Sequence, residues 1–187
     1  MNLINHSTKN TSSAAFASAA LALSVLFSSS AIAHPFFEPS DASPGATYEG
    51  VLNIPHGCEL EATTSITLRL DKSIFAGVAP ASNGDWKAEV EDKGDAFQIT
   101  WSGGNVAWDQ NGVFKLSAEI AKGADTGEKY FPVIQKCTNN QTQRWIAVPK
   151  NDEEPDLPAA IFEVVAKGAK PSAGHSHGKM DPGKGHH

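Results

Sequence analysis

A histidine directly after a cleavage pattern gives this chain its most distinctive chemical group. His34 follows Ala31-Ile32-Ala33, the small-x-small pattern that signal peptidase reads, so cleavage there would make His34 the amino terminus. The α-amine and ring Nδ1 of such a residue can close a chelate ring on one metal ion. Because the unperturbed pKa of an α-amine is about 8, a metal displaces its proton at neutral pH, and imidazole is a favoured ligand of Cu(II).

Pro35 restricts how this amino terminus would bind a metal. Proline has no amide proton, so the second backbone nitrogen cannot be deprotonated to become a ligand. Because Cu(II) prefers a tetragonal set of nitrogen and oxygen donors, the two nitrogens of His34 need further donors from elsewhere in the fold.

Two cysteines, Cys58 and Cys137, are the other residues with distinctive chemistry. An even number of cysteines in an exported chain predicts a disulfide. Closing the long loop between them would contribute on the order of 4–5 kcal/mol in the loop-entropy model, before native strain reduces it. The alternative, a pair of thiolate metal ligands, is disfavoured because neither cysteine has a C-x-x-C or similar zinc spacing.

Residues 1–33 have the composition of an export signal. They carry Lys9 and no acidic residue, and their apolar run at residues 14–26 is too short to span a bilayer comfortably. A retained amphipathic or membrane-anchoring helix is the alternative, but flanking stop-transfer charges are absent. We therefore expect residues 1–33 to be removed and the protein to be periplasmic or secreted, without stable membrane insertion after cleavage.

The remaining chain of roughly 150 residues is long enough for one domain with its own core. Removing residues 1–33 takes away one lysine and no acid, so the formal charge changes from −6 to −7. An acidic surface without a basic cluster repels phosphate backbones, so nucleic acid is not an expected partner.

Short segments rich in β-branched and aromatic residues predict an all-β domain. Apolar and polar residues alternate in residues 65–70 and 113–120, as strands with one buried face require. Turns are expected at residues 83–85, 93–95 and 102–105, where glycine supplies a positive φ. The expected strands cover residues 48–54, 64–70, 86–91, 97–101, 113–120, 130–134, 144–148 and 161–165. This pattern predicts an immunoglobulin-like or cupredoxin-like antiparallel β-sandwich.

The expected domain covers residues 34–166, and residues 167–187 are expected to form a disordered tail. Gly, Pro, Lys, Ser and His dominate this tail, and Met180 is its one large apolar side chain. Its histidines are His175, His177, His186 and His187. Such tracts bind soft and borderline metals weakly. The alternative for the last two is the remnant of an affinity tag, although two histidines would make a poor one.

Several short motifs in order resemble those of a known family. They are His34, Glu38-Pro39, Gly45, Ile54-Pro55-His56-Gly57-Cys58, Thr63-Thr64, Trp86, Phe131-Pro132-Val133-Ile134-Gln135-Lys136-Cys137 and Arg144-Trp145. With them, the chain resembles the YcnI-like family of exported bacterial copper-associated proteins over most of the expected domain. The resemblance implies a β-sandwich whose amino-terminal histidine binds Cu(II) beside a tryptophan.

Carried onto this sequence, the resemblance makes His34 the histidine ligand and Trp145 the tryptophan near the metal. Family members that use a glutamate ligand place it before a Gly-Trp or Gly-x-Trp turn, but residues 77–82 contain no acid. His56 is the expected replacement, because Cys58 would tie it to the region of Cys137 and Trp145.

Other roles remain open for these residues. His56 would also serve as a turn residue, in which case Glu38 or Glu49 becomes the candidate third ligand. Tryptophans more often pack in a core than contact a metal, and the four of this chain are Trp86, Trp101, Trp108 and Trp145.

Three classes of function fit these features. The expected one is a non-enzymatic, exported copper-binding protein of copper homeostasis: a chaperone, buffer or sensor with the copper ion and possible copper-trafficking proteins as partners. The alternatives are an oxidative copper enzyme of the histidine-brace kind, and a structural sandwich with incidental histidines. Hydrolase chemistry is disfavoured because the chain has no Ser/His/Asp signature and no paired-carboxylate motif.

Overall fold

The computed structural model describes residues 34–150 and 155–169. The predicted signal segment and the four tail histidines lie outside the described residues. Within the described part of the chain, no helix is long and apolar enough to cross a membrane. One short 3₁₀ turn, Thr138–Asn140, interrupts the strands of that part.

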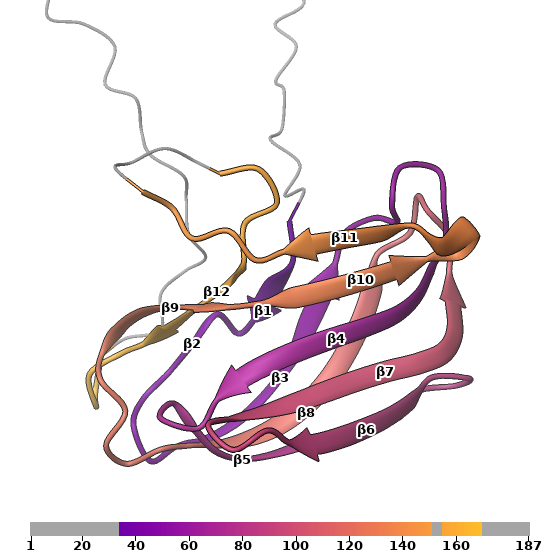
Figure 1. Cartoon of the computed structure of the whole chain (residues 1–187). Coiled ribbons are helices and arrows are strands. Elements are labelled where there is room, and N and C mark those ends of the chain that lie inside the picture. The colour runs from indigo at the N-terminus through magenta and orange to yellow at the C-terminus, as the bar shows by residue number, and fades with distance from the viewer. Residues whose placement is uncertain (1–33, 151–154, 170–187) are drawn as a thin grey trace, which may run out of the picture. The chain divides into compact units, whose positions relative to one another are not determined.

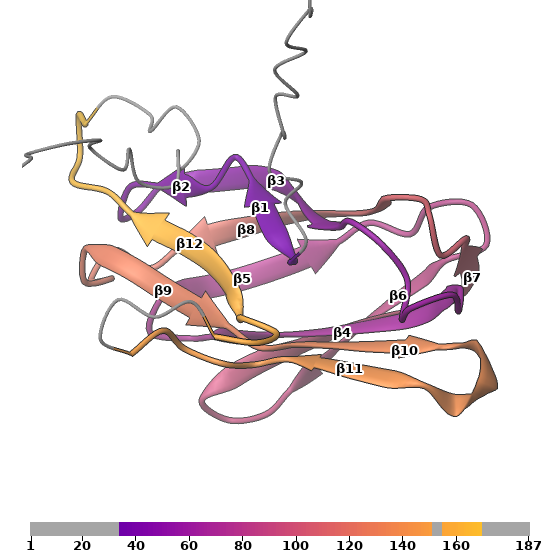
Figure 2. The same ribbon diagram turned by 90° about the horizontal axis from the view of Figure 1, so that it is seen from above.

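Two antiparallel sheets face each other, and a smaller sheet lies beside them (Figure 1). The first sheet has the order β1 (Phe36–Glu38), β3 (Thr47–Ile54), β8 (Gly112–Ile120) and β5 (Phe75–Pro80). The second has the order β11 (Thr142–Trp145), β10 (Val133–Cys137), β4 (Thr63–Asp71), β7 (Ala96–Val106) and β6 (Lys87–Asp92). The small sheet has the order β2 (Asp41–Ala42), β12 (Ala160–Val164) and β9 (Gly127–Phe131). Figure 2 shows β3 and β8 in one layer and β10 and β11 in the other.

The core lies between the sheets and is built by the alternation that the sequence shows. In β4 the side chains of Ile66, Leu68 and Leu70 are all fully buried, while Arg69 between them is exposed. One face of β8 is buried in the same way. Burial of one face therefore fixes the register of both central strands, because a slip of one residue would expose the whole apolar set.

Aromatic rings close the core on the side of the small sheet. The ring centroids of Phe37 and Phe162 are 5.7 Å apart, and those of Phe37 and Phe131 are 6.0 Å apart in an edge-to-face arrangement. Phe37 is 2% exposed. It therefore anchors the short strand β1 to both β9 and β12.

Three local predictions are wrong at the level of single residues. The expected strand at residues 130–134 is two strands, because Pro132 has no amide hydrogen and the chain passes there from β9 to β10. The strand expected at residues 144–148 ends at Trp145. The turn expected at residues 102–105 lies inside β7, where Gly103 has a φ of +90° and the pairing with β4 shifts register.

The turn expected at residues 93–95 is confirmed. It joins β6 to β7, and Gly94 has a φ of +82°. The amide of Lys93 donates to the carbonyl of Ala96. The hairpin therefore needs glycine at its tip, where a side chain would be strained.

The predicted disulfide between Cys58 and Cys137 is confirmed. The two Cα atoms are 6.0 Å apart, and both residues are buried. Cys137 ends β10, whereas Cys58 lies in the loop that follows β3. The bond therefore fastens the loop after one sheet to a strand of the other.

Candidate functional site

The pairing of β1 with β3 brings His34 and His56 to the same end of one ladder. The strands are antiparallel, with Phe36 opposite Asn53 as the last pair. His34 precedes Phe36 by two positions, and His56 follows Asn53 by three. Because neighbouring strands lie about 4.8 Å apart, the backbones that carry the two histidines leave the ladder side by side. Both residues are partly buried.

The ring of His56 is held in one tautomer. Its Nδ1 lies 2.7 Å from the carbonyl oxygen of Gly57. A carbonyl oxygen only accepts hydrogen bonds, so Nδ1 carries a proton in this contact, and the neutral form of the ring then has its lone pair on Nε2. Metal-binding histidines in proteins are oriented by the same kind of bond from the ring nitrogen that does not bind the metal.

Trp145 lies against the ring of His56. The two ring centroids are 5.9 Å apart with an interplanar angle of 65°. Trp145 is the last residue of β11, an edge strand, and only 4% of it is exposed. The contact therefore joins the end of the second sheet to the loop that follows β3.

Gln135 is a site residue that sequence reasoning missed. It is fully buried, and its Nε2 donates both to the carbonyl of His56 at 2.7 Å and to Oγ1 of Thr63 at 2.8 Å. Its Oε1 accepts from Nε1 of Trp145 at 2.9 Å. The alternation of β10 could have indicated that Gln135 is buried, because it lies on the same side of the strand as the buried residues Val133 and Cys137.

Gly57 lets the loop after His56 pack closely. Its amide donates to the carbonyl of Trp108 at 2.8 Å. A Cβ at this position would lie 2.1 Å from the carbonyl oxygen of Glu61 and 2.8 Å from Cα of Trp108. Both neighbours are backbone atoms, so only glycine fits without a shift of the loop.

The turn at Cys58–Glu61 is also bonded to the 3₁₀ turn Thr138–Asn140, which joins β10 to β11. Cys58 and Glu61 exchange two backbone hydrogen bonds. The Glu61 carboxylate accepts from Thr138 and from Nδ2 of Asn139. Those two bonds hold the pKa of Glu61 below its ordinary value, the bond from Thr138 most strongly. The His56 loop is thus fastened through the disulfide, through Gln135 and through Glu61.

The two carboxylates considered as alternative ligands lie elsewhere. Glu38 pairs with Val51, and it follows His34 by four positions, which is about 13 Å along an extended strand. Glu49 lies two residues further from the His56 end of β3. Both line a hollow of about 440 Å³ together with Lys115. Neither carboxylate therefore shares the end of the ladder that carries the histidines.

Among the described residues, no three His, Cys, Asp or Glu side chains form a group that would hold a metal ion. A metal at the histidine end of β1 and β3 would need a donor of another kind. Cleavage before His34 would release such a donor, the α-amine, which in the uncleaved chain is a peptide nitrogen.

The four tryptophans divide into three environments. Trp101 and Trp145 are buried, and Trp86 is partly buried, with its ring centroid 4.9 Å from that of Phe114. Trp108 is 46% exposed, so it lies outside the core. Its backbone packs on Gly57.

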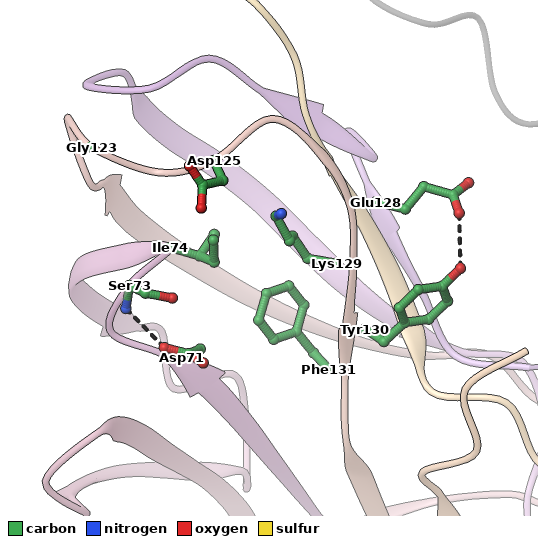
Figure 3. A pocket seen from close by; sticks show the side chains of 9 residues that line it. All are labelled: Asp71, Ser73, Ile74, Gly123, Asp125, Glu128, Lys129, Tyr130 and Phe131. Carbon is green, nitrogen blue, oxygen red and sulfur yellow. Dashed lines mark hydrogen bonds between the residues drawn. The ribbon is translucent and has the colours of Figure 1, made fainter.

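A second hollow, of about 360 Å³, lies between the end of β4 and β9 (Figure 3). Carboxylates of Asp71, Asp125 and Glu128 line it. Asp71 accepts from the amide of Ser73, and Glu128 accepts from the hydroxyl of Tyr130 at 2.8 Å. The bond to Glu128 raises the pKa of Tyr130. None of the predicted site residues lines this hollow, and two of its carboxylates are used in local hydrogen bonds.

Comparisons with known proteins identify the domain and its fold. A family model described as "Domain of unknown function (DUF1775)" matches residues 34–164. No protein of curated function matches the sequence. Among solved structures, the chain is similar to an uncharacterized protein from Nocardia farcinica described as having an immunoglobulin-like fold. The sequence identity is 24% and the TM-score 0.61, over 71% of this chain and 99% of that one.

Two cohesins are more distant in structure. A cohesin–dockerin complex from Clostridium thermocellum has 13% identity and a TM-score of 0.45, over 71% of this chain and 98% of that one. A non-cellulosomal cohesin from Archaeoglobus fulgidus has 9% identity and a TM-score of 0.41, over 72% and 92%. The likeness to the Nocardia protein shows the fold alone, and it confirms the predicted immunoglobulin-like sandwich.

We predict that Gly57→Ala destabilises the domain, because the added methyl group meets two backbone atoms. Overpacking of this kind costs about 1–3 kcal/mol in the free energy of unfolding. Urea unfolding of the disulfide-bonded protein measures the change. Gly123→Ala is the matched control, because a Cβ there meets nothing within 4 Å. Equal unfolding free energies for the two variants would contradict the close packing of the His56 loop.

Proposed function

We propose that this chain, which belongs to the DUF1775 family through residues 34–164, is an exported copper-binding protein, as the resemblance of its motifs to the YcnI-like family implies. In this proposal the mature amino terminus, His34, binds Cu(II) with His56, and Trp145 lies beside the ion. Copper is the cargo of a chaperone, buffer or sensor that acts outside the cytoplasm, and no reaction is catalysed.

The observation that carries the proposal is the contact between the rings of His56 and Trp145. It lies beyond the end of β3, where the start of β1 pairs with β3. The rings of His56 and Trp145 are 5.9 Å apart, and the last pair of the ladder sets His34 beside the chain that leads to His56. These three residues come from parts of the chain that are far apart in sequence. A purely structural sandwich has no need to gather them.

The donors available there suit Cu(II). His34 would supply its α-amine and Nδ1 after cleavage, and His56 would supply Nε2, because its Nδ1–H is engaged with Gly57. Three nitrogens and a water molecule match the tetragonal preference of Cu(II). Nδ1 of His34 lies 3.3 Å from the carbonyl oxygen of Pro35 in the uncleaved chain, and chelation would replace this contact.

The environment of the histidines suits a cargo that must enter and leave. Both are partly buried, whereas a structural metal site is typically closed. Trp145 supplies an apolar wall on one side of His56. The tail histidines His175, His177, His186 and His187 would add weak capture sites that raise the local supply of copper.

Cu(II) titration of the mature chain, residues 34–187, tests the proposal against the same chain with its α-amine acetylated. Acetylation converts the amine of His34 into an amide and removes one nitrogen donor without supplying a new amine. We expect the acetylated chain to lose its tight site, with affinity lowered by more than the roughly 10–100-fold that loss of an outer-shell partner costs. Equal affinity of the two chains would rule out the amino-terminal site.

We further predict that His56→Ala weakens Cu(II) binding and changes the nitrogen hyperfine pattern in the electron paramagnetic resonance spectrum. The reason is the loss of one imidazole from the plane of donors. Binding should also quench the fluorescence of Trp145 less in this variant. Glu38→Gln and Glu49→Gln are the controls, because these carboxylates lie away from the histidines. An unchanged affinity and spectrum in His56→Ala, with a loss in either control, would make His56 a turn residue.

A further inference from the structure

Gln135 holds both His56 and Trp145 with one side chain. Its amide nitrogen donates to the His56 carbonyl at 2.7 Å and to Thr63 at 2.8 Å, and its amide oxygen accepts from Trp145 at 2.9 Å. Gln135 is 0% exposed, and Thr63 is 1% exposed. No solvent is therefore available to replace any of these bonds.

A neutral amide fits all three partners. The His56 carbonyl needs a donor and the Trp145 indole needs an acceptor, and a glutamine side chain supplies both. A leucine of similar size supplies neither. An ionised glutamate would accept from Trp145 but would set a negative charge against the carbonyl oxygen of His56.

We propose that Gln135 is the positioning residue of the site, which fixes His56 and Trp145 relative to each other before any metal binds. The metal-binding role of Gln135 rests on the proposed function, whereas the hydrogen bonds that fix His56 and Trp145 do not. The bond to the His56 carbonyl fixes the backbone that carries the ring. The bond from the Trp145 indole directs its N–H toward Gln135 on β10 and fixes the plane of the ring.

The neighbouring glutamine on β11 shows what a merely structural amide looks like here. Gln143 is the cross-strand partner of Gln135, so their side chains share one face of the sheet. The Oε1 atom of Gln143 is buried and accepts no hydrogen bond within the described part of the chain. Gln143→Leu is therefore a matched control for Gln135→Leu, with the same chemical change one strand away.

The first test uses the metal-free mature protein. In ¹H–¹⁵N spectra we expect Gln135→Leu to shift the Trp145 indole N–H signal and to remove its protection from solvent exchange. The ring signals of His56 should move in the same variant, because its backbone loses a donor. Gln143→Leu should leave both residues unchanged. A folded Gln135→Leu protein in which the His56 signals stay in place would overturn the proposal.

Gln135→Glu keeps the test decisive if Gln135→Leu does not fold. Burial raises the pKa of a carboxyl group at this position, and the protonated acid still donates one hydrogen bond and accepts another. The signals of His56 and Trp145 should therefore resemble wild type at low pH and depart from it together as the acid ionises. Signals that titrate as they do in the wild-type protein would contradict a positioning role.

The second test loads the same proteins with Cu(II). Loss of an outer-shell partner typically lowers metal affinity about 10–100-fold, and we expect a loss in that range for Gln135→Leu, with an altered paramagnetic resonance spectrum. Gln143→Leu should match wild type. If wild-type protein binds no copper, the proposed function fails, but the metal-free test still shows whether Gln135 positions His56 and Trp145. If wild type binds and Gln135→Leu binds equally with the same spectrum, the positioning role is wrong.

Discussion

The pairing of β1 with β3 is the constraint on which the candidate site depends. β1 has only three residues, Phe36–Glu38, and three backbone pairs define its register. Phe37 secures that register, because its ring is buried among the rings of Phe131 and Phe162. A slip of one residue would turn Phe37 out of the core and move the chain at His34 away from the end of β3. A core contact thus decides where the amino terminus of the domain lies.

The other half of the site belongs to the second sheet, where β10 makes three separate connections to the parts of the chain that carry His56 and Trp145. Cys137 binds the His56 loop covalently, Gln135 binds its backbone through a buried amide, and β11, which ends in Trp145, pairs along the outer side of β10. Gly57 permits this density of contacts because no side chain intervenes between the loop and its neighbours. His56 is therefore held by a preformed frame, while His34 is placed by the register of one short strand.

The fold was predictable from sequence where periodicity is long and one-sided. The alternation in β4 and β8, the glycine turn between β6 and β7 and the even number of cysteines each indicated what the structure shows. β1 and β2 are too short for any periodicity, and β5 contains Gly77 and Pro80, which disfavour strands. Gln135 could not be assigned a role because its three partners meet only in the folded chain. The same holds for the pairing of β1 with β3, which brings His34 and His56 to one end of the ladder.

The number of imidazoles bound to copper distinguishes a shared site of His34 and His56 from a site at the amino terminus alone. Electron spin echo envelope modulation detects the remote nitrogen of each coordinated imidazole. The sample is mature protein with one equivalent of Cu(II), in which His175, His177, His186 and His187 are replaced by alanine so that the domain alone contributes. Binding by both histidines predicts modulation from two imidazoles, those of His34 and His56, whereas modulation from one imidazole or from none would contradict it.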